Sequence, residues 1–111
     1  LIPVQPQYYA ADGLTELLKV VKGTKKRFNP EIEMEGILFT MDSARYNNSK
    51  RNKRAVKEAY GKEMRIFENS IPRSEAIAEI ASEGISIFAY DSRSKGAKSY
   101  EMLAQEVLNR A

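Results

Sequence analysis

The sequence contains no histidine, cysteine or tryptophan, and only three of its 111 residues are aspartate. Without histidine or cysteine the chain cannot use imidazole acid–base catalysis, a thiolate nucleophile, a disulfide, an iron–sulfur cluster or a Cys/His zinc site. So few aspartates also argue against a metal site made of carboxylates alone. We therefore do not expect an enzyme that works with its own side chains only, and we predict no catalytic residue and no metal ligand.

Long hydrophobic segments are absent too. No apolar run approaches the ~20 residues that cross a bilayer, and the chain does not open with a signal-peptide pattern. Its length suits one domain with one core, and 30% charged with 42% hydrophobic residues is ordinary for a globular protein. We expect a single domain over residues 1–111.

The first half of the chain alternates between strand and helix patterns. Residues 1–4 are predicted as a short strand, and residues 36–41 form a continuous apolar run typical of a strand covered on both faces. Between them, apolar residues at helical spacing predict a helix over 12–28. A mostly charged helix is predicted over residues 49–61.

The second half repeats this order. Residues 65–71 are predicted as a strand, and Ser74 is a candidate N-cap of a short helix that ends before Gly84. Residues 85–90 are either a short strand or an extended connection, and Ser94 can cap a last helix. The apolar face of that helix comprises Ala97, Tyr100, Leu103, Ala104, Val107 and Leu108. The alternation predicts an α/β fold with a partial, parallel-rich sheet flanked by helices.

The chain starts on apolar residues, without methionine or a polar leader. Because natural termini are usually exposed and frayed, this start predicts the later part of a longer protein; the alternative is a short edge strand in a complete small domain. If the strand 1–4 pairs with a strand outside this sequence, its free edge exposes backbone donors and acceptors. We then expect self-association through that edge or through the uncovered face of the sheet.

Positive charge is concentrated in one window. Residues 45–57 hold six basic residues and no acidic one, so the window carries +6 and the rest of the +3 chain sums to −3. A second basic cluster lies at residues 19–27. Such clusters neutralise DNA phosphates, which gives salt-dependent binding that ignores base sequence, and the alternative is a solvated helix face. The basic residues of the window are Arg45, Lys50, Arg51, Lys53, Arg54 and Lys57.

Four short segments are specific enough to compare with a known family. They are IPVQPQYYAADGL at 2–14, GILFTMD at 36–42 followed by Arg45, IPR at 71–73 and YDSRSKGA at 90–97. In this order and spacing they resemble segments of the ParA/Soj-type partition ATPases, which are related to MinD. The family counterparts are the stretch after the Walker B region, the next strand and its loop, the nucleotide-base loop and the closing helix.

The resemblance implies a P-loop NTPase fold and a position within it. The family's deviant Walker A loop carries a signature lysine, but this sequence has no glycine-rich phosphate loop followed by Lys-Ser/Thr. The chain therefore resembles the C-terminal half of a ParA/MinD-like protein without its Walker A and Walker B segments. ATP and Mg²⁺ would be cofactors of the full-length parent. We expect neither to bind this chain tightly, and we do not expect the chain alone to hydrolyse ATP.

The resemblance also implies site residues. In ParA-like proteins the base loop and the end of the preceding strand line the adenine pocket, which places Thr40, Met41, Pro72 and Arg73 there. All six basic residues of the 45–57 window would contact nonspecific DNA.

The implied function is that of a DNA-partition ATPase located in the cytoplasm at the nucleoid. In the parent, ATP would close a homodimer, the dimer would bind DNA nonspecifically, and a ParB-like partner would stimulate hydrolysis. Membrane binding is not expected, because Glu101, Gln105 and Glu106 are spaced along the last helix. The membrane-binding helix of MinD-type relatives is basic instead. The alternative is a free-standing basic α/β module that binds nucleic acid or another partner without nucleotide.

Overall fold

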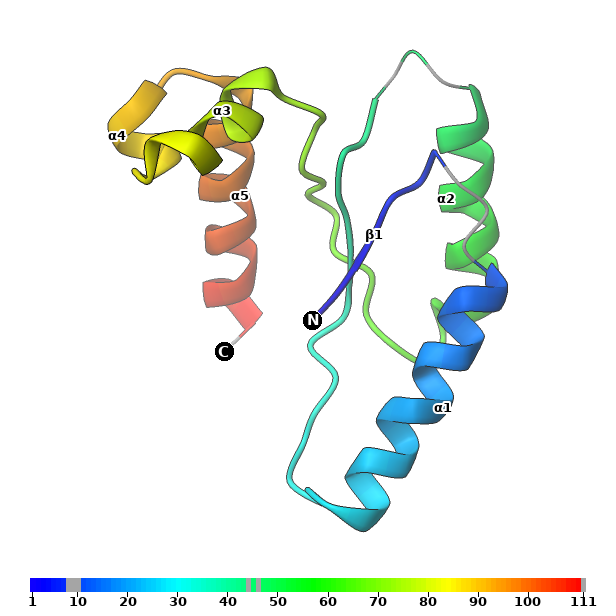
Figure 1. Ribbon diagram of the computed structural model, residues 1–111. Coiled ribbons are helices and arrows are strands. Elements are labelled where there is room, and N and C mark those ends of the chain that lie inside the picture. The colour runs from blue at the N-terminus through cyan, green and yellow to red at the C-terminus, as the bar shows by residue number, and fades with distance from the viewer. Residues whose placement is uncertain (8–10, 44, 46, 111) are drawn as a thin grey trace.

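The computed structural model describes residues 1–7, 11–43, 45 and 47–110 (Figure 1). Within these residues the elements are β1 (Ile2–Val4), α1 (Ala11–Arg27), β2 (Ile37–Phe39), α2 (Asn47–Tyr60), α3 (Glu75–Glu83), α4 (Ile87–Asp91) and α5 (Lys95–Arg110). The first four elements confirm the predicted alternation of strand and helix. Residues 8–10, part of the first segment compared above, lie outside the described residues. The fold class is α/β, as predicted.

The sheet has β2 at its centre. β1 pairs with β2 in parallel on one side, and an extended segment runs parallel to β2 on the other. The extended segment contributes two isolated bridges, Ile37 with Ile66 and Asp42 with Pro72. The β1–β2 pairs are Ile2 with Ile37, Pro3 with Leu38 and Val4 with Phe39. The parallel pairing that the sequence predicts is therefore confirmed.

The prediction of a continuous strand over residues 65–71 is wrong. The N–H of Phe67 donates to Ile37 O, and the N–H of Ile71 donates to Phe39 O, both at 2.9 Å. Four steps along this segment therefore correspond to two steps along β2, so the chain bulges between the two contacts. The extra residues lose their pairing with β2, and only isolated bridges remain.

α5 supplies the hydrogen bonds that β2 cannot give the bulge. Glu106 Oε2 accepts from the N–H of Glu68 at 2.9 Å, and Oε1 accepts from the N–H of Asn69 at 3.0 Å and its Nδ2 at 2.7 Å. Partial burial raises the pKa of Glu106, but these hydrogen bonds and the nearby Arg110 charge outweigh it, so that pKa lies below its ordinary value. The ionised carboxylate therefore fastens α5 to the sheet.

We expect Glu106→Gln to lower the free energy of unfolding by about 1–2 kcal/mol at neutral pH, because an amide offers one acceptor oxygen instead of two. Since the folded-state pKa of Glu106 is depressed, its contribution is complete above the ordinary value of 4.5 and is lost as pH falls through the folded value. Urea unfolding at neutral pH and again well below pH 4.5 measures the difference. The difference in the free energy of unfolding between the variant and the unaltered chain should be smaller in acid. A difference that is the same at both pH values would contradict this role of Glu106. The control variant is Glu101→Gln, at an exposed position on α5.

The core lies on both faces of β2. Figure 1 shows α1 and α2 on one side of the strands and α5 on the other. The cluster facing α1 and α2 comprises Ile2, Val4, Leu14, Leu18, Ile37, Phe39 and Val56, and the cluster facing α5 comprises Leu38, Phe67, Ile71 and Leu103. Because successive strand residues point to opposite faces, covering both faces requires all three β2 residues to be apolar.

Residues 85–90 form neither of the two structures that the sequence left open. Ile87–Asp91 is the short helix α4. Its start is set locally, because the Ser86 hydroxyl accepts a hydrogen bond from the N–H of Ala89 at 3.1 Å. Only Ile87 of this helix is buried, so no apolar periodicity marks it.

The helix caps predicted on either side of α4 are confirmed. The Ser74 hydroxyl accepts from the N–H of Ile77 at 3.4 Å, and Gly84 ends α3 in the left-handed conformation. The Ser94 hydroxyl accepts from the N–H of Ala97 at 3.1 Å. These caps fix the directions of α3 and α5.

α5 buries a narrower face than the sequence predicts. Ala97 and Leu103 are buried, whereas Tyr100 and Leu108 of the predicted face are exposed. In the cluster that includes Leu38, Phe67 and Ile71, α5 contributes Leu103 and the partly buried Val107. In the described part of the chain, no helix is both long and apolar enough to span a membrane.

Candidate anion-binding groove

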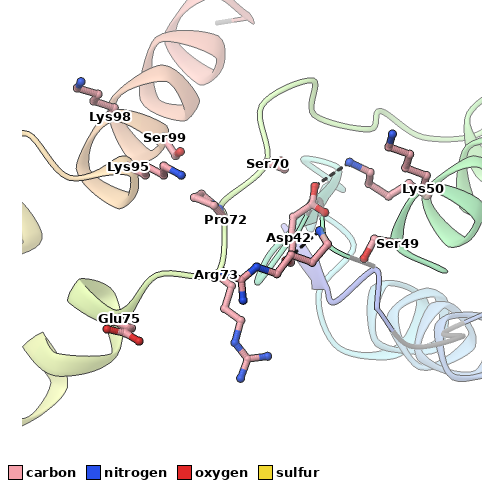
Figure 2. A pocket seen from close by; sticks show the side chains of 13 residues that line it. Asp42, Ser49, Lys50, Ser70, Pro72, Arg73, Glu75, Lys95, Lys98 and Ser99 are labelled. Atoms are coloured by element: carbon pink, nitrogen blue, oxygen red, sulfur yellow. Dashed lines mark hydrogen bonds and ion pairs between the residues drawn. The ribbon is translucent and has the colours of Figure 1, made fainter. Parts of the chain in front are cut away.

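A groove of about 980 Å³ lies at the carboxyl end of the sheet (Figure 2). The loop after β2 and residues 70–73 lie between its two sides, which α2 and the first turns of α3 and α5 provide. Open α/β sheets bind ligands beyond the carboxyl ends of their strands, where loops and helix ends converge. The groove is therefore in the position expected of a ligand site.

The groove is strongly basic. Six cationic side chains line it against two carboxylates, Asp42 and Glu75, which leaves a formal charge of +4. Ser49 adds a buried hydroxyl that has no hydrogen-bond partner among the described residues. The cations are Arg45, Lys50, Lys53, Arg73, Lys95 and Lys98. Charge-assisted hydrogen bonds from such groups favour a phosphate-bearing ligand.

α2 presents basic side chains to solvent because its opposite face is fastened to the protein. Val56 is buried in the core, and Asn52 Nδ2 donates to a backbone carbonyl just after β1 at 2.8 Å. The helical period places Lys50, Arg54 and Lys57 together on the outer face. All three side chains are exposed.

The structure divides the six predicted DNA-binding residues into two groups. Arg45, Lys50 and Lys53 line the groove. Arg51, Arg54 and Lys57 are exposed on α2 outside the groove. The basic window therefore extends from the groove along the outer surface of α2.

Lys53 forms an ion pair inside the groove. Its Nζ donates to Asp42 Oδ2 at 2.7 Å, and the exposed fractions of the two side chains are 28% and 13%. Nζ also lies 6.0 Å from the centre of the Phe39 ring. The backbone of Asp42 is held by the neighbouring segment, since its N–H donates to Ile71 O and its O accepts from the N–H of Arg73, both at 3.0 Å.

The four residues predicted for a nucleotide-base pocket are only partly brought together. Pro72 and Arg73 line the groove, whereas Thr40 and Met41 do not. The N–H of Thr40 donates to Val4 O at 2.9 Å, which continues the sheet pairing. Met41 has a positive φ of 49°, and the next residue, Asp42, pairs with the segment 70–73 and lines the groove instead.

Lys95 and Lys98 are groove residues that the sequence patterns do not reveal. They lie in the first turn of α5, and Figure 2 shows them across the groove from Lys50. The local signal is a serine cap followed by two lysines, which predicts where the helix starts. That this helix end faces α2 depends on contacts between segments far apart in the sequence.

The residues present do not build a complete nucleotide site. In the part of the chain that the structure describes, no three His, Cys, Asp or Glu side chains gather where they could hold a metal ion. The sequence also has no glycine-rich phosphate loop. We therefore assign no triphosphate or Mg²⁺ ligand and derive no step through either.

Comparison with known proteins gives matches along almost the entire chain, although no protein-family model matches it. The chain is 38% identical over 110 residues to the chromosome partitioning protein ParA of Myxococcus xanthus, a match that covers 99% of this chain and 38% of that protein. It is 39% identical over 107 residues to the sporulation initiation inhibitor protein Soj of Bacillus subtilis, a match that covers 96% of this chain and 42% of that protein. It is 37% identical over 109 residues to the chromosome-partitioning ATPase Soj of Treponema pallidum, a match that covers 98% of this chain and 42% of that protein. The chain thus spans about two fifths of the length of these relatives.

Proposed function

This chain is homologous over nearly its whole length to the ParA/Soj chromosome-partitioning ATPases, and on that premise we propose that it is the DNA-facing and base-facing part of such an ATPase. Residues 1–111 would be the C-terminal portion of the parent, without its Walker A and Walker B segments. Two observations support this position: the chain matches about two fifths of the relatives, and its segments resemble those that follow the Walker B region.

The proposal for DNA rests mainly on one observation, the continuity of positive charge. The +4 groove opens onto the outer face of α2, where Arg51, Arg54 and Lys57 extend the basic surface beyond the groove. A single nucleotide would not use so long a surface, whereas a duplex carries phosphates at regular intervals. Nonspecific duplex DNA is therefore the ligand that fits the geometry best.

The base-facing part of the proposal concerns Pro72 and Arg73. Both line the groove beyond the carboxyl ends of the strands, and an arginine guanidinium can stack on a purine. Thr40 and Met41, at the end of β2, would support this loop from the sheet side. In the parent, ATP and Mg²⁺ would be held chiefly by a phosphate loop that this chain does not contain.

The partners proposed for the parent are a second copy, nonspecific DNA and a ParB-like protein, in the cytoplasm at the nucleoid. The outer edge of β1 supports self-association, because among the described residues β1 pairs with β2 alone and Pro3 is exposed. No membrane role is proposed.

Salt-titrated binding to duplex DNA tests the proposal. If about five of the basic side chains contact phosphates, a plot of log affinity against log salt concentration should have a slope of about −4.5. Fluorescence anisotropy with two labelled duplexes of unrelated sequence measures this slope with the 111-residue chain. The two duplexes should bind equally well.

The outcomes separate the proposal from the alternative of a free-standing module. No binding at low salt would reject DNA contact by this chain. Binding with the expected slope, together with a lysine-containing glycine-rich loop encoded upstream in the same reading frame, would support the ATPase. The same binding without such a loop would favour the module.

A further inference from the structure

We infer that Asp42 limits the affinity of the groove for DNA by keeping Lys53 bound within the protein. The inference rests on the proposed DNA-binding function and adds an attenuating residue to it. Asp42 is one of only two carboxylates among the groove residues, and it lies between the sides that α2 and α5 provide (Figure 2).

The backbone of Asp42 is fixed at the end of the sheet, and the ion pair with Lys53 orients its carboxylate. Hydrogen bonds to Ile71 O and from the N–H of Arg73 tie residue 42 to the neighbouring segment, and its side chain is only 13% exposed. An incoming phosphate therefore meets a negative charge that cannot easily turn away. The like charges repel each other at this point of the groove.

Lys53 differs from the other cations of the groove. Within the described part of the chain, it is the one groove cation that lies within ion-pair distance of a carboxylate, at 2.7 Å from Asp42. Its side chain lies near the Phe39 ring and is 28% exposed, so a small change of rotamer would bring Nζ to the groove surface. DNA must break this ion pair before Lys53 can contact a phosphate.

Replacing Asp42 with asparagine should therefore increase DNA affinity. The variant keeps the size of the side chain and the backbone hydrogen bonds, but it removes the repulsion and releases Lys53. We expect Asp42→Asn to tighten binding about tenfold at low salt and to steepen the log–log salt slope by about 0.9, the value of one additional phosphate contact. Anisotropy titrations of the 111-residue chain at several salt concentrations measure both quantities.

Two further variants identify the cause. Asp42→Asn combined with Lys53→Gln removes both charges of the pair, leaves the groove charge as it was, and should return affinity and slope to those of the unaltered chain. Glu75→Gln changes the groove charge by the same one unit, but Glu75 forms no ion pair among the described residues, so it should tighten binding no more than about twofold without changing the slope. Thermal unfolding confirms that each variant is folded. If Asp42→Asn does not fold, Asp42→Ser takes its place.

The results distinguish this inference from the proposed function. If the unaltered chain binds DNA and Asp42→Asn does not bind more tightly, the inference is wrong and the proposed function stands. It is also wrong if the double variant keeps the gain, because Lys53 would then not be the released contact. If neither the unaltered chain nor Asp42→Asn binds DNA, both are wrong.

Discussion

Replacing Lys50, Arg54 and Lys57 with glutamine is expected to weaken duplex DNA binding on the order of 100-fold at low salt, taking each phosphate contact as worth about 1 kcal/mol. The three side chains share the outer face of α2 and are exposed there. The salt slope should become shallower by about 2.7, since three counterion-releasing contacts are lost. Glutamine has nearly the helix propensity of lysine and arginine, so α2 should remain folded.

The matched control makes the same charge change elsewhere. Lys22, Lys25 and Lys26 belong to the second basic cluster, near the end of α1, and all three are exposed. In Figure 1 this end of α1 lies at the bottom of the view, whereas the amino end of α2 lies at the top. Their replacement with glutamine should weaken binding less than about threefold, through screened long-range charge alone. Equal losses from the two triple variants would show that only net charge matters and would refute the assignment to α2.

Gly36→Ala is expected to lower the free energy of unfolding by about 3 kcal/mol, a large share of the total for a chain of this size. Gly36 has a φ of +144°, which residues with a Cβ rarely adopt. An added Cβ would lie 2.7 Å from Arg65 O, a backbone atom, and 3.1 Å from Phe67 Cε2. Gly36 O also accepts from the N–H of Ile2 at 2.9 Å, so displacement of this residue would disturb β1.

The control for this substitution has the opposite expected sign. Gly23 lies inside α1, and an added Cβ there would meet nothing within 4 Å. Gly23→Ala should raise the free energy of unfolding by about 0.5–1 kcal/mol, because alanine loses less conformational entropy in a helix. Urea unfolding of both variants against the unaltered chain measures the two changes. A neutral Gly36→Ala would show that the backbone at this position can adopt another conformation.

Local patterns predicted most of the elements. β2 is apolar at all three positions because both of its faces are covered, and α1 and α2 follow the spacing of Leu14, Leu18 and Val56. The caps at Ser74 and Ser94 depend on hydrogen bonds that reach only three residues along the chain, so the sequence alone reveals them. The sequence pattern does not reveal α4, because this helix is five residues long and buries one side chain, too few for an apolar periodicity.

The candidate site was predictable only in part. The basic window is visible in composition, and its six residues do lie on α2 and the loop before it. Thr40 continues the pairing with β1 and Met41 has a positive φ, and neither lines the groove, which no residue pattern predicts. The pairing of Lys53 with Asp42 likewise depends on the position of α2 beside the end of β2.

By itself, then, the sequence determined the class of fold, the family resemblance, the starts of α3 and α5 and the excess of positive charge at residues 45–57. Only the tertiary structure decided that residues 65–71 bulge and that the Glu106 carboxylate accepts hydrogen bonds from the backbone N–H groups of the bulge. It also decided that Lys95 and Lys98 face Lys50 across one groove. The physical reason is the range of the interactions. Helical period and capping act within a few residues, whereas the bulge and the groove form when α5 packs against a sheet whose strands come from the other end of the chain.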